Sequence, residues 1–102
     1  MNREVRAHVD FIKYLKVATK RQSRFLIDTI TSDQLKALRD IIYNILLGNC
    51  RVKTSTKTKL VKYKSIMRAI VERSVSRNKL KDLFKKLIPI LSLILNEALH
   101  CL

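Results

Sequence analysis

The chain has 102 residues, 47% of them apolar, and a formal net charge of +14 at pH 7. This apolar content excludes a disordered basic tail, and the length suits a single domain over residues 1–102 with a modest buried core. One glycine and one proline are too few for the many corners of an all-β fold, because such corners commonly need both residues. The composition therefore predicts an all-α protein.

The positive charge is concentrated in one part of the chain. Residues 51–86, the basic segment, contain 13 of the 22 lysines and arginines but two acids, Glu72 and Asp82, and so carry +11 of the net charge. Residues 87–102 contain no lysine or arginine and are mostly apolar. Because clustered like charges repel one another, the basic segment predicts a polyanionic partner, first nucleic acid and second an anionic membrane.

The first half of the chain predicts two long helices. Apolar residues recur at nearly helical spacing over about residues 3–19, which predicts the first helix. A basic connector follows, with a short apolar piece that could form one or two helical turns. Thr31 and Gln34 then fit a capping box, and Gly48 stands where a helix C-terminus favours a left-handed residue. These signals predict the second helix over residues 32–47.

The second half of the chain predicts the remaining helices. Apolar stripes at helical spacing indicate helices over about residues 55–73 and 76–88, with lysines and arginines on their outer faces. Pro89 is expected to kink or end the second of these, because proline clashes with the preceding helical turn. The apolar tail predicts a last helix over residues 90–101, either central to the core or half of an oligomer interface. The predicted fold is a compact all-α bundle of four or five helices.

The sequence contains no pattern typical of an active site. Phosphate-binding and dinucleotide-binding loops need several glycines, and this chain has one. The eight acids are scattered and do not form the carboxylate cluster of a two-metal nuclease. His8 and His100 lack metal-ligand spacing, although a pair of Cys50 with either histidine remains open. We therefore expect a protein that is not an enzyme and that holds no metal and no cofactor.

The sequence also predicts the cellular compartment of the protein. Cys50 and Cys101 are too far apart in sequence to make a disulfide framework, so we expect a reducing, intracellular compartment. Charges recur throughout residues 1–16, which argues against a signal peptide and against secretion. The longest strongly apolar run, residues 87–95, is nine residues long, whereas a membrane span needs about 20. We therefore expect an intracellular protein without a transmembrane segment.

The candidate contacts for a polyanion are cations on the outer faces of the third and fourth predicted helices and in the loop before them. They are Arg51, Lys53, Lys57, Lys59, Lys62, Lys64, Arg68, Arg73, Arg77, Lys79 and Lys81. Lys57, Lys64 and Arg68 fall on one helical stripe, and few acids are present to pair with them at i,i+4 spacing. Lysine outnumbers arginine in the basic segment, which favours contacts to the phosphate backbone over base reading.

Two patterns in the basic segment have alternative interpretations. The hydroxyls of residues 54–58 and the lysines beside them stand at a helix start, and they indicate either a solvated helix end or a phosphate site. Tyr63 lies between Lys62 and Lys64, as a base-stacking residue of a single-strand binder would. It also falls on the apolar stripe of its helix, and core packing is the favoured interpretation.

Four stretches of the chain form a further pattern. They are Phe25-Leu26-Ile27-Asp28-Thr29-Ile30-Thr31-Ser32-Asp33-Gln34-Leu35, Leu46-Leu47-Gly48-Asn49, Lys62-Tyr63-Lys64-Ser65-Ile66-Met67-Arg68 and Ser74-Val75-Ser76-Arg77-Asn78-Lys79. Over roughly residues 5–87 the chain resembles the short basic reading frames of Polinton (Maverick) elements and adintovirus-like DNA viruses. This resemblance implies a candidate virion-core or DNA-packaging component, and it assigns no functional residue. Family members often end in a Gly-rich apolar tail, whereas residues 90–102 contain no glycine, so a processed or membrane-active tail is not expected.

These observations predict sequence-nonspecific binding of nucleic acid, in the first place double-stranded DNA, by a packaging or architectural protein of the nucleus or a virion. One alternative is a helical interaction module whose apolar tail forms a homo-oligomer or docks on a partner, through Ile90, Leu91, Ile94, Leu95 and Ala98. A second is a sequence-specific regulator with a recognition helix. A third is a membrane-surface protein that inserts the apolar tail beside a basic anchor, and this is the least expected.

Overall fold

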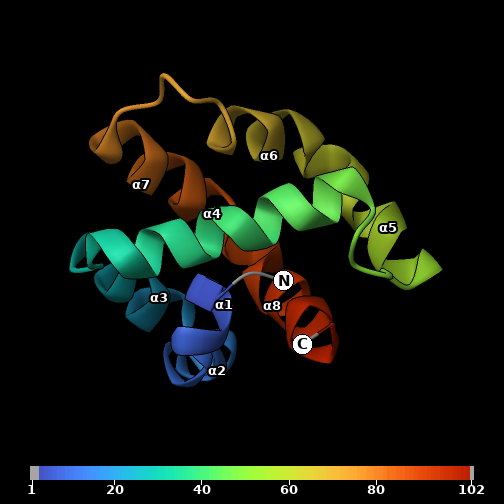
Figure 1. The fold of residues 1–102 in the computed structure, drawn as a ribbon, viewed down its shortest axis with the longest axis horizontal. Coiled ribbons are helices and arrows are strands. Elements are labelled where there is room, and N and C mark those ends of the chain that lie inside the picture. Colours follow the sequence, from blue (N-terminus) through green and yellow to red (C-terminus); the bar gives the residue numbers. More distant parts are fainter. Residues whose placement is uncertain (1–2, 102) are drawn as a thin grey trace.

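The computed structural model describes residues 3–101, and every regular element in that range is helical (Figure 1). The elements are α1 (Arg3–Ala7), α2 (Val9–Val17), α3 (Lys20–Asp28), α4 (Ser32–Leu47), α5 (Thr54–Leu60), the 3-10 turn η1 (Val61–Tyr63), α6 (Lys64–Ile70), α7 (Arg77–Lys86) and α8 (Ile88–His100). They form a compact globule with a Cα radius of gyration of 12.3 Å. The predicted all-α fold is confirmed, but the chain is divided into more and shorter helices than the four or five predicted.

The first predicted helix is in fact two helices. The chain expected to be helical over residues 3–19 breaks at His8, whose backbone dihedrals of φ −116° and ψ 24° do not continue the helix. Val5, Ile12 and Leu15 are nevertheless buried, as the apolar periodicity predicts. The periodicity therefore identified the buried face correctly and missed the break.

The connector expected next is the helix α3. Its N-terminus is a complete capping box, in which Thr19 Oγ1 accepts a hydrogen bond from the Gln22 backbone N–H at 3.1 Å. In return, Gln22 Oε1 accepts from the Thr19 backbone N–H at 2.9 Å. The Thr-x-x-Gln spacing is the same as the one that predicted the next helix, so a sequence signal for α3 was present among the basic residues.

The helix predicted over residues 32–47 is confirmed as α4. Thr31 Oγ1 accepts from the Gln34 backbone N–H at 3.1 Å, and Gln34 Oε1 accepts from the Thr31 backbone N–H at 3.0 Å. Gly48 follows the helix with φ 77°, the left-handed conformation in which glycine ends a helix without strain. Both boundaries of α4 are thus set by local chemistry that the sequence displays.

The helix predicted over residues 55–73 is divided into α5, η1 and α6 and ends early. Its core residues keep their positions, because Leu60 and Met67 are buried and Tyr63 packs against the core. This confirms core packing as the interpretation of Tyr63. Val61, at the start of η1, is left 62% exposed on the outer side.

The apolar tail forms α8, which is the centre of the core. The helix predicted over residues 76–88 ends at Lys86 as α7, and Pro89 lies in the first turn of α8. Of the two predicted outcomes, a kink or an end, the helix before Pro89 ends. Pro89 is tolerated in the first turn of α8 because a backbone N–H there has no helical partner to lose. α8 contacts α2, α3, α4, α5 and α7, and Figure 1 shows it running behind α4.

The residues considered for an oligomer interface lie inside the monomer. They are Ile90, Leu91, Ile94, Leu95 and Ala98, and none of them is more than 6% exposed. The helices packed around α8 cover these side chains, so in the folded chain they are not available to a partner or to a membrane. Between residues 3 and 101, no helix is long and apolar enough to cross a membrane.

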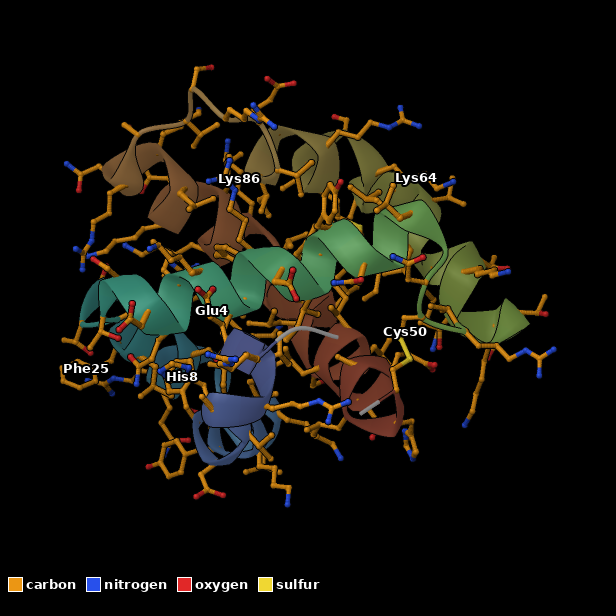
Figure 2. The ribbon with its side chains drawn as sticks, in the orientation of Figure 1. Glu4, His8, Phe25, Cys50, Lys64 and Lys86 are labelled. Carbon is orange, nitrogen blue, oxygen red and sulfur yellow. A yellow bond between two sulfur atoms is a disulfide. The ribbon has the colours of Figure 1, made fainter. Side chains whose placement is uncertain are left out.

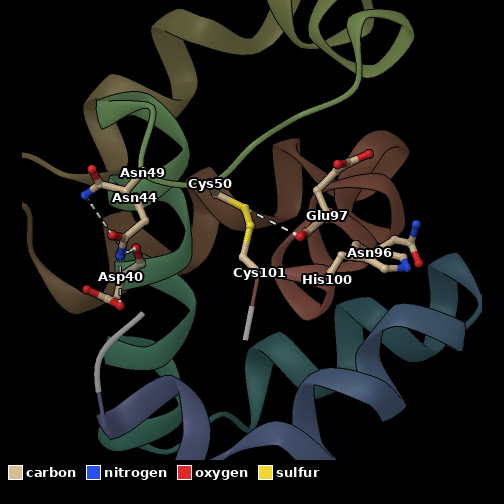
Figure 3. Close-up of a disulfide and its surroundings, with 8 residues drawn as sticks. All are labelled: Asp40, Asn44, Asn49, Cys50, Asn96, Glu97, His100 and Cys101. Carbon is tan, nitrogen blue, oxygen red and sulfur yellow. Dashed lines mark hydrogen bonds between the residues drawn. A yellow bond between two sulfur atoms is a disulfide. The ribbon is translucent and has the colours of Figure 1, made fainter.

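Cys50 and Cys101 form a disulfide, contrary to the expectation that two such distant cysteines would stay reduced (Figure 3). They are 51 positions apart in sequence, but the fold brings the loop after α4 against the end of α8, and the two Cα atoms lie 5.8 Å apart. Separation in sequence does not prevent a bridge when the helices between the cysteines fold back. The prediction of a reducing compartment rested on unpaired thiols, so the cysteines do not support it.

The disulfide should stabilise the fold by restricting the unfolded chain. For cysteines 51 positions apart, the chain-entropy relation gives about 4 kcal/mol. We expect the double variant Cys50→Ala, Cys101→Ala to have a free energy of unfolding about 2–4 kcal/mol lower, measured by urea titration with circular dichroism. Reductant should destabilise the wild-type protein and leave the variant unchanged. Equal stability of the wild-type protein with and without reductant would contradict this role.

The central position of α8 predicts that Leu91→Asp unfolds the protein. Leu91 is 2% exposed, and an unpaired carboxylate placed there would lose its hydration without gaining a partner. We expect loss of helical circular dichroism and of cooperative thermal unfolding. Leu47→Asp is the matched control, because Leu47 is 55% exposed, and it should cost less than about 1 kcal/mol. A folded, monomeric Leu91→Asp protein would instead place α8 at the surface.

Candidate nucleic-acid interface

The cations predicted to contact a polyanion lie on the loop after α4, on α5, η1 and α6, and on the chain from there into α7. Ten of the eleven are exposed, and Lys81 is partly buried. In Figure 1 the elements that carry them form the upper and right-hand edge of the molecule. Figure 2 shows Lys64 at this edge, above the C-terminal end of α4. The predicted residues thus gather on one side, but their surroundings differ.

Four of these cations border a groove between the end of α4, the loop that follows it, and α5, η1 and α6. Arg51, Lys57, Lys64 and Arg68 line this groove, which has a volume of about 720 Å³. Its apolar lining comprises Ile45, Leu46, Val52, Leu60, Val61 and Met67. None of the lining residues between positions 3 and 101 is acidic. The stripe predicted from sequence therefore comes together, although the helix that was expected to carry it is interrupted by η1.

The loop that carries Arg51 is held at its start by hydrogen bonds to α4 and by the disulfide (Figure 3). After Gly48, the Asn49 backbone N–H donates to the Asn44 carbonyl oxygen at 3.0 Å, and Asn49 Nδ2 donates to Asn44 Oδ1 at 3.1 Å. The next residue, Cys50, is buried and is bridged to the chain at the end of α8. These attachments fix the loop while the Arg51 side chain remains exposed.

Lys53, Lys59 and Lys62 extend the charged surface beyond the groove. Together with the four groove cations they form the basic face, defined as Arg51, Lys53, Lys57, Lys59, Lys62, Lys64 and Arg68. All seven side chains are exposed. Within the described part of the chain none of them makes an ion pair, since the ion pair found there joins Lys85 to Asp28. Arg73 is also exposed, in the turn between α6 and α7.

Two of the three predicted cations of α7 form hydrogen bonds within the protein. Arg77 donates hydrogen bonds at 2.8 Å to the Ile30 carbonyl oxygen and to Oγ of Ser32, the first residue of α4. Lys81 Nζ donates to the Asp28 carbonyl oxygen at 3.0 Å. Cations at a helix C-terminus satisfy its last carbonyl groups. Arg77 and Lys81 thus attach α7 to the connection between α3 and α4, and Lys79 remains unattached and exposed.

Two of the hydroxyl groups at the start of α5 also donate hydrogen bonds within the protein. Thr56 is 4% exposed, and its Oγ1 donates to Glu97 Oε1 at 3.1 Å, while Thr58 Oγ1 donates to the Thr54 carbonyl oxygen at 3.1 Å. These bonds leave few hydroxyl donors for a phosphate, so they favour the solvated helix end. The buried bond between Thr56 and Glu97 instead attaches α5 to α8. The sequence offered no signal for it, because an acid in a helix is ordinarily solvated.

Residues 3–101 contain no group of three histidines, cysteines, aspartates or glutamates placed to hold a metal ion. His8 Nδ1 lies 2.9 Å from the Glu4 carbonyl oxygen, and His100 Nδ1 lies 2.8 Å from the Asn96 carbonyl oxygen. Each ring therefore contacts the backbone four residues before it. Cys50 is in the disulfide, so it has no thiolate for the Cys–His pair that the sequence left open.

Comparison with known proteins finds no match to this chain among family models, curated proteins or solved structures. The function is therefore inferred from the chemistry of the site. That chemistry is a row of unpaired cations beside an aliphatic groove, which suits anionic groups and, next to them, apolar ones.

Two substitutions compare the contributions of Arg77 and Lys79, both on α7, to the stability of the fold. We expect Arg77→Gln to lower the free energy of unfolding by about 1–2 kcal/mol, because two hydrogen bonds from a charged donor are lost. Lys79→Gln should change it by less than about 0.5 kcal/mol, since the Lys79 side chain is exposed. Urea titrations followed by circular dichroism compare the two variants. Equal stabilities would contradict the attachment of α7 through Arg77.

Proposed function

We propose that this protein binds double-stranded DNA without sequence specificity, through the basic face, as a packaging or architectural protein. The observation that carries the proposal is that all seven side chains of the basic face are exposed and lack an acidic partner among residues 3–101. Cations gathered in this way repel one another, and a bound polyanion removes that repulsion. The regular spacing of DNA phosphates offers many anions to one face at once.

Binding of this kind depends on phosphate contacts and on the release of counterions. If six or seven phosphates are neutralised, the logarithm of the association constant should fall by about 5–6 for each tenfold rise in salt. Five of the seven cations of the basic face are lysines. Lysine acts as a point charge on a flexible stem, which favours contacts to phosphate over the bidentate reading of bases.

The position of α7 favours non-specific binding over sequence-specific binding. A recognition helix presents residues of its N-terminal part to the edges of bases. In α7, Arg77 and Lys81 bond to the connection between α3 and α4 instead. The other helices of the basic segment, α5 and α6, have seven residues each and are therefore about 10 Å long. Helices of this length offer few positions that could read consecutive base pairs.

The role in packaging draws on the resemblance to the basic reading frames of Polinton elements and adintovirus-like viruses. In such viruses small basic proteins are candidates for virion cores. A location in a nucleus or a virion belongs to the same proposal, because the DNA to be bound is found there.

Charge reversal on the basic face tests the proposal. We expect the triple variant Lys57→Glu, Lys64→Glu, Arg68→Glu to lose at least about 100-fold in affinity for double-stranded DNA, since each lost phosphate contact weakens binding and each new acid repels the backbone. Fluorescence anisotropy with two unrelated DNA duplexes over a series of salt concentrations measures this loss. The wild-type protein should bind both duplexes alike.

The matched control reverses Lys13, Lys20 and Arg24, which are also two lysines and one arginine. They are exposed on α2 and α3, on the opposite side of the molecule from α5 and α6 (Figure 1). Because the net charge changes by the same amount, this variant should lose less than about tenfold in affinity if binding is local to the basic face. Equal losses in the two triple variants, or affinity that does not change with salt, would contradict the proposal.

A further inference from the structure

The groove beside the basic face has an apolar surface that phosphate binding does not use. Ile45 and Leu46 are partly buried and Val61 is 62% exposed, although all three line the groove. Aliphatic side chains, one exposed and the others partly or fully buried, line a groove of about 720 Å³, which has the size and composition of a binding site. The groove therefore offers an apolar surface that bound DNA, which presents phosphates, would leave uncovered.

The charges around the groove restrict what can fill it. Arg51, Lys57, Lys64 and Arg68 border the aliphatic surface, and the lining contains no acid. A complementary ligand must therefore carry acidic groups next to an aliphatic surface. The lining also contains no aromatic side chain, whereas sites for single-stranded nucleic acid stack bases on aromatic rings. Nucleobases are thus poor candidates for the apolar contact.

We propose that this groove binds an acidic amphipathic helix of a partner protein. Aliphatic side chains at i, i+3, i+4 and i+7 of such a helix would cover Ile45, Leu46 and Val61, and its glutamates and aspartates would pair with the bordering cations. The exposure of Val61 indicates that the groove is open to solvent. A helix closes an open groove with its own polar face, whereas the acyl chain of a lipid would remain partly in water.

The helix and DNA would compete for this protein, because Lys57, Lys64 and Arg68 belong both to the groove and to the basic face. A partner helix would then release DNA, and DNA would weaken the binding of the helix to the same degree. This competition rests on the proposed DNA binding. The binding of the helix does not, so the two can be tested separately.

The probe is a labelled synthetic peptide of about 16 residues, with leucine at i, i+3, i+4 and i+7 and glutamate at most other positions. A second peptide has the same composition in an order that scatters the leucines around the helix. We expect the full-length protein to bind the amphipathic peptide at least about tenfold more tightly than the scattered one in fluorescence anisotropy, because only the first presents a continuous apolar face. The equal charge of the two peptides removes simple attraction to a basic protein as an explanation.

The variant Val61→Asn tests whether the groove is the site. It removes an exposed apolar contact without changing the charge, and it should weaken the amphipathic peptide about fivefold. Leu47→Asn is the matched control, because Leu47 is similarly exposed at 55% but does not line the groove, and it should bind the peptide as the wild type does. Both variants should bind DNA with unchanged affinity.

Equal binding of the two peptides, or no effect of Val61→Asn on peptide binding, would overturn the proposal even if DNA is bound as expected. Binding of laurate in place of the peptide, with sensitivity to Val61→Asn, would assign the groove to a lipid and overturn it as well. If the peptide binds with the expected dependence on Val61 while DNA does not bind, the proposed function fails and this inference stands.

Discussion

Burial of α8 is the constraint on which the rest of the structure depends. This helix contacts α2, α3, α4, α5 and α7, and its residues Ile94 and Leu95 have no exposed surface. Each such side chain contributes about 1.5–3 kcal/mol when it is taken out of water. An unpaired charge in the same place would cost more than one apolar side chain contributes. With the apolar tail at the centre, the cations of the basic segment must therefore lie on the outside of the helices that surround it.

Two links attach α5 and the loop before it, which carry part of the basic face, to the C-terminal end of α8. Thr56 of α5 bonds to Glu97 in the last turn of α8, and Cys50 is bridged to Cys101, the residue that follows the helix. The cations around them repel one another and favour detachment of α5 and the preceding loop. A covalent bridge and a buried hydrogen bond oppose that repulsion. The geometry of the groove depends on the disulfide in particular, because Cys50 itself lines the groove.

The sequence predicts those features of the fold that have local causes. The capping box at Thr31 and the left-handed Gly48 determine both ends of α4, and each is visible in a few consecutive residues. The capping box at Thr19 is equally local, but the cations around it resembled a linker, so only one or two helical turns in the apolar second half of α3 were predicted. The disulfide of Cys50 and the hydrogen bonds of Arg77 were beyond sequence reasoning, because each joins residues at least 45 positions apart. Their partners become neighbours only when the helices have packed around α8.

The contrast between α6 and α7 shows that the net charge of a segment overestimates how many of its cations are free to bind a ligand. Both helices carry exposed cations, but Arg77, Lys81 and Lys85 of α7 are attached to the end of α3 and the chain leading into α4. Their charge is balanced by carbonyl groups and by Asp28, so a polyanion gains little there. Among residues 3–101 the basic face has no such partners, so a bound polyanion would supply the first anion for each of its cations. A ligand bound there stabilises the folded protein by mass action. Such stabilisation would be greatest where the free protein repels itself most, so on the proposed function the local density of unpaired charge, more than the net charge, would determine where a polyanion binds.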